Sequence, residues 1–221
     1  AMQIAVATSA LVMLCSALLA TWRHVRTGTL SWRRLWAMLT GIAVGGIAGA
    51  LLALEVSGEW IRWLFVIYLL ATIIDCYLRA GFMTPPSRRV VPSVPHELTT
   101  GGIIGLIASF LGVGGSVMTV PLMRRRGVLM SEAAAMANVL TLPLAATATL
   151  TWLVMAWLSP VALPAGFVGN IWLSAAAQLV AGSWLGLKIA SRWLARLPDR
   201  WHVRIYPLLL IAVLLVMSVR G

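Results

Sequence analysis

The sequence predicts an all-α polytopic membrane protein with about seven apolar segments in two inverted repeats and one glycine-broken re-entrant helix. Hydrophobic residues make up 61% of the 221 residues and charged residues only 10%, whereas soluble domains have about 25% charged residues. The net charge of +11 lies in short clusters between apolar runs, as the positive-inside rule expects of cytoplasmic loops. The order of segments and the glycine spacings also recur once along the chain, and the charges of corresponding loops are inverted.

The first half contains three apolar runs, and each is about long enough to span a bilayer. Basic residues follow the first and third runs, so we expect those loops to be cytoplasmic, whereas the acidic connection Glu55–Glu59 is expected outside. Gly45 and Gly49 lie four residues apart on the second run and predict a close helix crossing. Asp75 is expected to be solvated or paired with Arg79, four residues on. The runs are Gln3–Thr21, Leu35–Leu54 and Trp60–Leu78.

A linker at residues 81–98 separates the halves, because it holds four prolines and two arginines and such stretches interrupt regular structure. The predicted division is a first transmembrane repeat at 1–80, this cytoplasmic linker, and a second transmembrane repeat at 99–221.

The stretch after the linker, Gly101–Leu122, is apolar enough for a membrane span but is a poor helix. Gly112, Gly114 and Gly115 fall within four positions, and each costs roughly 1 kcal/mol relative to alanine in a helix interior. Pro121 then removes a backbone donor. The alternative is a continuous helix in which the glycines only allow close packing.

We therefore expect two half-helices, Thr100–Leu111 and Ser116–Met123, broken at the glycines. A re-entrant hairpin of this kind returns the basic triplet Arg124–Arg126 to the cytoplasmic side, which fits the charge rule better than a full crossing. The second half-helix would present free N–H groups and the positive end of its dipole to a cavity, which is the chemistry of an anion site.

Three further apolar runs complete the second half. Ser131 is expected to cap the first of them, which Pro143 is expected to interrupt. The uncharged loop 159–166 is expected outside and the basic loop Lys188–Arg200 inside. The runs are Glu132–Leu158, Phe167–Leu187 and Trp201–Val219.

Short motifs match between the halves, and the charges of corresponding loops differ as inverted-topology repeats require. Such repeats place a substrate site near the bilayer midplane; the alternative is chance similarity between alanine- and glycine-rich stretches. The first repeat lacks a counterpart of the glycine-broken stretch, so we expect its N-terminal segment to be missing from this sequence. The matches are Ala1–Gln3 with Ala135–Ala137, Gly45 and Gly49 with Gly182 and Gly186, and Phe65 with Tyr206.

The glycine–proline motif Gly112–Leu122, followed by Gly127 and Ala135–Ala137, resembles the TauE/SafE family of sulfite exporter-like transporters, and Ala5–Ser9 resembles the corresponding first-half segment. The resemblance covers most of both halves. It implies a permease or exporter for small anions such as sulfite, sulfonates or thiosulfate, coupled to an ion gradient, in the bacterial inner membrane. The chain departs from the family pattern in lacking the first-half glycine motif, at Ser116, and at Asn138–Thr141.

Polar residues in apolar surroundings are the candidates for contacting the anion. Asn138 could face a cavity or form an interhelical hydrogen bond, and each serine or threonine could instead bond to its own helix. The candidate substrate-binding residues are Gly112, Gly114, Gly115, Ser116, Asn138, Thr141, Thr8 and Ser9.

Other function classes find little support in the sequence. No carboxylate lies deep in an apolar run, and the histidines and the cysteines, Cys15 and Cys76, lack metal-site spacing. We expect no catalytic residues, no metal and no cofactor. The expected partners are a small anionic substrate and the lipid bilayer, with no nucleic acid, and the oligomeric state is left open. The alternative function is a membrane-embedded scaffold subunit or enzyme without transport activity.

Overall fold

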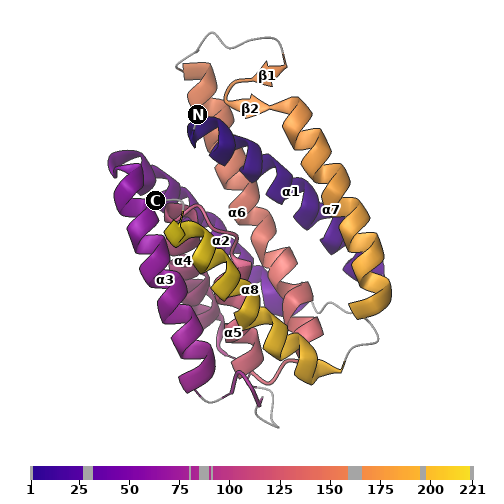
Figure 1. Ribbon diagram of the computed structural model, residues 1–221. Helices are drawn as coiled ribbons and strands as arrows, with labels where there is room; N and C mark the ends of the chain where they lie inside the picture. The colour runs from indigo at the N-terminus through magenta and orange to yellow at the C-terminus, as the bar shows by residue number, and fades with distance from the viewer. Residues whose placement is uncertain are drawn as a thin grey trace.

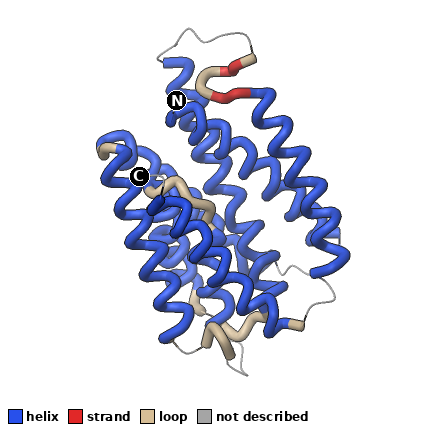
Figure 2. Tube along the Cα trace, viewed as in Figure 1, coloured by secondary structure: helices blue, strands red, loops and turns tan. Residues whose placement is uncertain are grey.

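The computed structural model describes residues 2–26, 32–79, 81–84, 90, 92–158, 166–194 and 198–219. Within these ranges the chain forms eight helices and one short β-hairpin, with the helices packed side by side and the hairpin at one end (Figures 1 and 2). The elements are α1 Met2–Arg26, α2 Trp32–Glu55, α3 Gly58–Leu78, α4 Val94–Phe110, α5 Ser116–Arg125, α6 Met130–Leu158, β1 Phe167–Val168, β2 Ile171–Trp172, α7 Leu173–Leu194 and α8 Asp199–Val219.

The predicted all-α membrane fold is confirmed. By length and composition, α2, α3, α6 and α8 could each cross a membrane, and α1 and α7 contain the shorter apolar stretches Ala7–Trp22 and Leu173–Ile189. Six of the predicted apolar runs recur as these helices, and the glycine-broken run forms two more, α4 and α5. The protein is therefore an integral membrane protein.

The predicted break is present between α4 and α5. α4 ends at Phe110 and α5 begins at Ser116, and Gly112 takes a φ of +67°, which glycine adopts without steric cost. The chain then returns to where it entered: the Arg126 guanidinium at the end of α5 donates to Glu97 in the first turn of α4 at 2.8 Å, and Val90 N–H donates to the Arg126 carbonyl. The α4–α5 pair is thus a re-entrant hairpin.

Three consecutive arginines hold the ends of several helices together around the end of α5. Arg124 is buried, and its Nε–H donates to the Phe82 carbonyl at 3.0 Å. Asp199, at the start of α8, also accepts the Met130 N–H of α6 at 2.8 Å. We call this part of the molecule the arginine end. Its ion pairs are Arg124 with Asp199, Arg125 with Asp75, and Arg126 with Glu97.

Several loops were predicted to be cytoplasmic. The parts of them that the structure describes lie at the arginine end. Asp75 near the end of α3 also pairs with Arg79 at 3.8 Å, as predicted. α2 runs parallel to α4, because Met38 packs on Gly101 and Ile42 on Gly105, so α2 also begins at this end. Arg88 and Arg89 lie outside the described residues. Which side of the membrane the arginine end faces stays a prediction.

The close crossing predicted from Gly45 and Gly49 is confirmed, and its partner is α4. A Cβ added to Gly45 would overlap the Gly102 carbonyl, and one added to Gly49 would overlap the Leu106 carbonyl. The two backbones therefore touch, as small residues allow in membrane helices. The matching glycines of α7, Gly182 and Gly186, differ: a Cβ there meets no described atom within 4 Å.

Some predicted segment boundaries are wrong. α4 starts at Val94 within the predicted linker, because Pro95 occupies its first turn, where proline needs no donor. α6 starts at Met130, before the predicted cap Ser131, and continues through Pro143; a membrane helix tolerates the lost hydrogen bond when neighbours satisfy the freed carbonyl.

The start of the predicted run Phe167–Leu187 is a hairpin rather than a helix. Phe167 pairs with Trp172 and Val168 with Ile171 in antiparallel register. Gly169 takes a φ of +54° in the turn between them, a conformation that tight hairpin turns need and that glycine supplies. The helical part of the run, α7, begins only at Leu173.

The helix contacts follow the correspondence predicted between the two halves. α1 packs on α6, and α3 packs on α8, so corresponding helices pair with each other. The contact of α2 with α6 is matched by that of α7 with α1. A twofold relation between α1–α3 and α6–α8 would produce this pattern.

Candidate functional site

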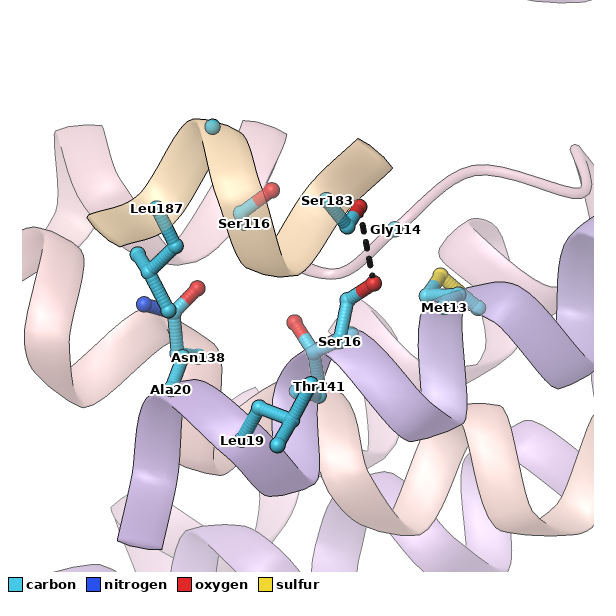
Figure 3. Close-up of a pocket in the computed structure, with 12 residues that line it drawn as sticks. Met13, Ser16, Leu19, Ala20, Gly114, Ser116, Asn138, Thr141, Ser183 and Leu187 are labelled. Atoms are coloured by element: carbon cyan, nitrogen blue, oxygen red, sulfur yellow. Dashed lines mark hydrogen bonds between the residues drawn. The ribbon is translucent and has the colours of Figure 1, made fainter. Parts of the chain in front are cut away.

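A cavity of about 380 Å³ lies between α1, α5, α6 and α7, next to the break in the re-entrant hairpin (Figure 3). Its walls bring together both halves of the chain. None of the lining residues carries a charge, although hydroxyl, amide and backbone groups are present. They are Met13, Ser16, Ala17, Leu19, Ala20, Gly114, Ser116, Asn138, Thr141, Ser183, Gly186 and Leu187.

The start of α5 supplies backbone donors to this cavity. Among the described residues, no hydrogen bond uses the amide N–H of Gly114, Gly115 or Ser116, as expected for the first turn of a helix. The first backbone bonds of the helix instead run from Val117 N–H to the Gly114 carbonyl and from Met118 N–H to the Gly115 carbonyl. Free N–H groups and the positive helix end together favour an anion.

The glycines leave this turn without side chains. A Cβ on Gly114 would lie 3.3 Å from the Met13 sulfur, and a Cβ on Gly115 would lie 3.8 Å from the Thr141 hydroxyl. Gly114 lines the cavity, whereas Gly115 is buried just behind it. Any larger residue at position 114 would occupy part of the space in front of the free amides.

α6 contributes Asn138 and Thr141 from one face. The Thr141 hydroxyl donates to the Ala137 carbonyl at 2.8 Å, so it offers its oxygen to the cavity rather than its proton. The Asn138 amide makes no hydrogen bond to any described residue and lines the cavity. Of the two alternatives for Asn138, the structure therefore favours the cavity-facing one over an interhelical bond.

Two serines that the sequence analysis did not single out complete the wall. The Ser16 hydroxyl of α1 donates to the Ser183 hydroxyl of α7 at 3.1 Å (Figure 3). Each is a polar residue within an apolar run, which was the available signal, but only tertiary packing puts them beside Ser116 and Asn138. This bond links the first half of the chain to the second directly at the cavity.

The remaining predicted site residues lie elsewhere. The Thr8 hydroxyl donates to the Ile4 carbonyl at 2.6 Å and accepts the Trp172 N–H at 3.1 Å, so it ties α1 to the hairpin. Ser9 is exposed and does not line the cavity. Gly112 forms the exposed turn before α5. The structure thus brings together Gly114, Ser116, Asn138 and Thr141, with Gly115 adjacent, and not Gly112, Thr8 or Ser9.

Comparison with known proteins gives one family. The model of the family described as "Sulfite exporter TauE/SafE" matches residues 1–219. No curated protein and no solved structure shows a significant match.

Proposed function

Because the chain belongs to the sulfite exporter TauE/SafE family of membrane transporters, we propose that it carries small anions across the bacterial inner membrane. The anions are sulfur-containing, such as sulfite, sulfonates or thiosulfate, and their movement is coupled to an ion gradient. One observation carries the proposal: the bare N-terminal turn of α5 opens into an uncharged cavity between the two halves of the chain.

The anion would accept hydrogen bonds from the Gly114, Gly115 and Ser116 amides, the Ser116 hydroxyl and the Asn138 amide. Hydrogen bonds to a charged group each contribute about 1.5–3 kcal/mol, so a few of them hold a small anion without a buried counter-charge. Transport also requires release, and a site without a fixed cation avoids binding the anion too tightly to leave.

Access to the cavity would alternate by relative movement of the helices that line it, α1, α5, α6 and α7, while α2 and α4, whose backbones touch, stay together. Inverted repeats commonly work by rocking of one repeat against the other around a central site. The Ser16–Ser183 hydrogen bond crosses between the halves at the cavity wall and is weak enough, at about 1 kcal/mol, to break in each cycle.

The test is uptake into proteoliposomes containing only the purified protein. Radiolabelled sulfite, thiosulfate and a small sulfonate should each be offered with an imposed proton or sodium gradient, and liposomes without protein give the background. Protein-dependent accumulation of at least one of these anions is the expected result. A folded protein that moves none of them under either gradient would instead favour the scaffold or enzyme alternative.

A further inference from the structure

The cavity between α1, α5, α6 and α7 has no charged residue in its described walls, and the inference rests on the anion site proposed there. Its positive potential comes from the first turn of α5, which acts as about half an elementary charge. The cost of moving an ion out of water grows with the square of its charge, so a divalent anion costs about four times as much as a monovalent one. The cavity therefore suits a monovalent anion.

No titratable side chain of the described residues lines this cavity. On the helices around it, those nearest in sequence to the lining residues are Cys15 of α1, Lys188 of α7 and Glu132 in the first turn of α6. The Lys188 ammonium lies over the Trp184 ring, 5.0 Å from the ring centroid. On α5 the charged groups are the arginines of the arginine end, which pair with carboxylates of other helices. A pH dependence of anion binding is therefore expected from the anion itself and not from the cavity wall.

The Thr141 side chain presents an oxygen that can only accept a hydrogen bond. Its proton is donated to the Ala137 carbonyl at 2.8 Å, and a carbonyl cannot donate, so the direction of this bond is fixed. The oxygen points into the cavity between Ser16 and Asn138 (Figure 3). It lies 3.8 Å from a Cβ placed on Gly115, in the turn with the free amides. An anion held by those amides thus meets donors on one side and an acceptor on another.

An unprotonated oxygen of the anion would be repelled by the lone pairs of the Thr141 oxygen, whereas a hydroxyl group of the anion can donate to them. We propose that the cavity selects the singly protonated form of a small oxyanion, such as hydrogensulfite, over the divalent form. The amides of Gly114 and Ser116 hold the charged oxygens of the anion, and its hydroxyl donates to Thr141. A sulfonate, which is monovalent but has no hydroxyl proton, binds less tightly. Thiosulfate and sulfate, which are divalent at neutral pH, bind least.

The proton then crosses the membrane on the substrate. Hydrogensulfite enters the cavity with its O–H bond intact and crosses as one unit with one negative charge. It dissociates into sulfite and a proton only in the water beyond, to the extent that the pH there sets. A proton gradient can thereby act on transport without a carboxylate in the cavity, and none of the lining residues is a carboxylate.

The experiment measures anion binding to the purified full-length protein in detergent by calorimetry, and uptake into proteoliposomes, at pH values on both sides of the half-protonation point of sulfite. Total sulfite is held constant. Methanesulfonate and sulfate keep the same charge over this range, so they reveal any effect of pH on the protein itself.

The informative variants are Thr141→Val, which removes the acceptor oxygen, and Thr141→Ser, which keeps it. Thr149→Val is the matched control. Thr149 is buried on the same helix and donates to the Ala145 carbonyl at 2.7 Å, but it does not line the cavity.

The apparent affinity for total sulfite should fall with rising pH in proportion to the hydrogensulfite fraction, while the affinity for methanesulfonate stays constant and sulfate does not bind. Thr141→Val should weaken hydrogensulfite binding by about fivefold without weakening methanesulfonate binding, so the ratio of the two affinities changes. Thr141→Ser and Thr149→Val should keep the wild-type ratio. Sulfite binding that does not depend on pH would overturn the proposal, and so would an equal loss of both anions in Thr141→Val.

This inference and the proposed function fail in different ways. A protein that transports sulfite and sulfate equally well at every pH keeps the function and loses the selection of the protonated form. A protein that binds hydrogensulfite in a Thr141-dependent manner but transports no anion keeps the selection and loses the function. If no sulfur-containing anion binds or moves at any pH, both are wrong.

Discussion

The Tyr206 hydroxyl donates to the carbonyl of Val117 at 3.0 Å, and this contact joins α8 to the broken helix α5. Val117 lies four residues before Pro121, so its carbonyl would normally accept the N–H that proline lacks. In a membrane a bare carbonyl is costly, and a neighbouring helix must satisfy it. Tyr206 fills that role, and the same side chain packs against Phe82 with ring centroids 5.7 Å apart.

Tyr206→Phe should therefore destabilise the protein by about 1–3 kcal/mol, because it strands the Val117 carbonyl. In a Pro121→Ala background the backbone N–H gained at position 121 can serve that carbonyl, so the cost of Tyr206→Phe should fall. Denaturation of the four proteins in detergent closes the double-mutant cycle. The same loss in both backgrounds would mean that the hydroxyl matters for some other reason.

The α2–α4 crossing allows a sharper comparison between two glycines. Gly45→Ala should destabilise by about 1–3 kcal/mol, because its Cβ would overlap the Gly102 carbonyl and the helices must separate. Gly182→Ala should stabilise by up to about 1 kcal/mol, because alanine favours helix and its Cβ meets no described atom within 4 Å. Melting temperatures of the two variants check this, and loss of stability at position 182 would indicate a packing partner there.

The features of the fold that local chemistry determines could be predicted from the sequence. Gly112 takes a positive φ, which glycine adopts without steric cost, and the neighbouring glycines further disfavour a continuous helix. Hydrophobicity alone could not separate the hairpin 167–172 from a helix, because short apolar runs suit both. The pair Gly169–Asn170 between two apolar pairs was the turn signal that could have done so.

Candidate site residues could be predicted where a helix break exposes the backbone or where a polar side chain stands out in an apolar helix. Ser116 follows directly from the helix break, and Asn138 stands out as an amide in an apolar helix. Thr8 was predicted on the same grounds, but it bonds to the hairpin, which the sequence analysis had taken as helix. Ser16 and Ser183 meet across 167 residues of sequence, a contact that depends on how α1 and α7 pack.

Gly114→Leu should abolish transport while leaving the fold intact. The leucine side chain would enter the cavity in front of the free amides, and its nearest neighbour is the Met13 sulfur at 3.3 Å, which can move because methionine is flexible. Uptake per folded protein is the measurement. Gly115→Leu is a poor substitute, because Gly115 is buried against Leu144 and Thr141 and the variant should also lose stability. Normal uptake by Gly114→Leu for every anion that wild type carries would remove the site from this turn.

Asn138→Ala should lower the apparent affinity for the transported anion by about tenfold with little effect on stability. The reason is that its amide has no partner among the described residues, so truncation leaves no protein group unpaired. Thr141→Val is the matched change on the same helix face, and it removes an oxygen that already bonds to Ala137. Anion-concentration curves for uptake, together with melting temperatures, test both. A large stability loss in Asn138→Ala would instead indicate a structural amide.

The arginine end should face the cytoplasm, because basic residues flank the membrane segments there. Thr84 lies exposed at this end beside Phe82, whose carbonyl accepts from Arg124, and Ser57 lies exposed in the connection between α2 and α3. In a background without Cys15 and Cys76, a membrane-impermeant maleimide applied to intact cells should label Ser57→Cys. It should label Thr84→Cys only after the membrane is opened. The reverse pattern would invert the topology, and labelling of both in intact cells would mean that Ser57 and Thr84 do not lie on opposite sides of the membrane.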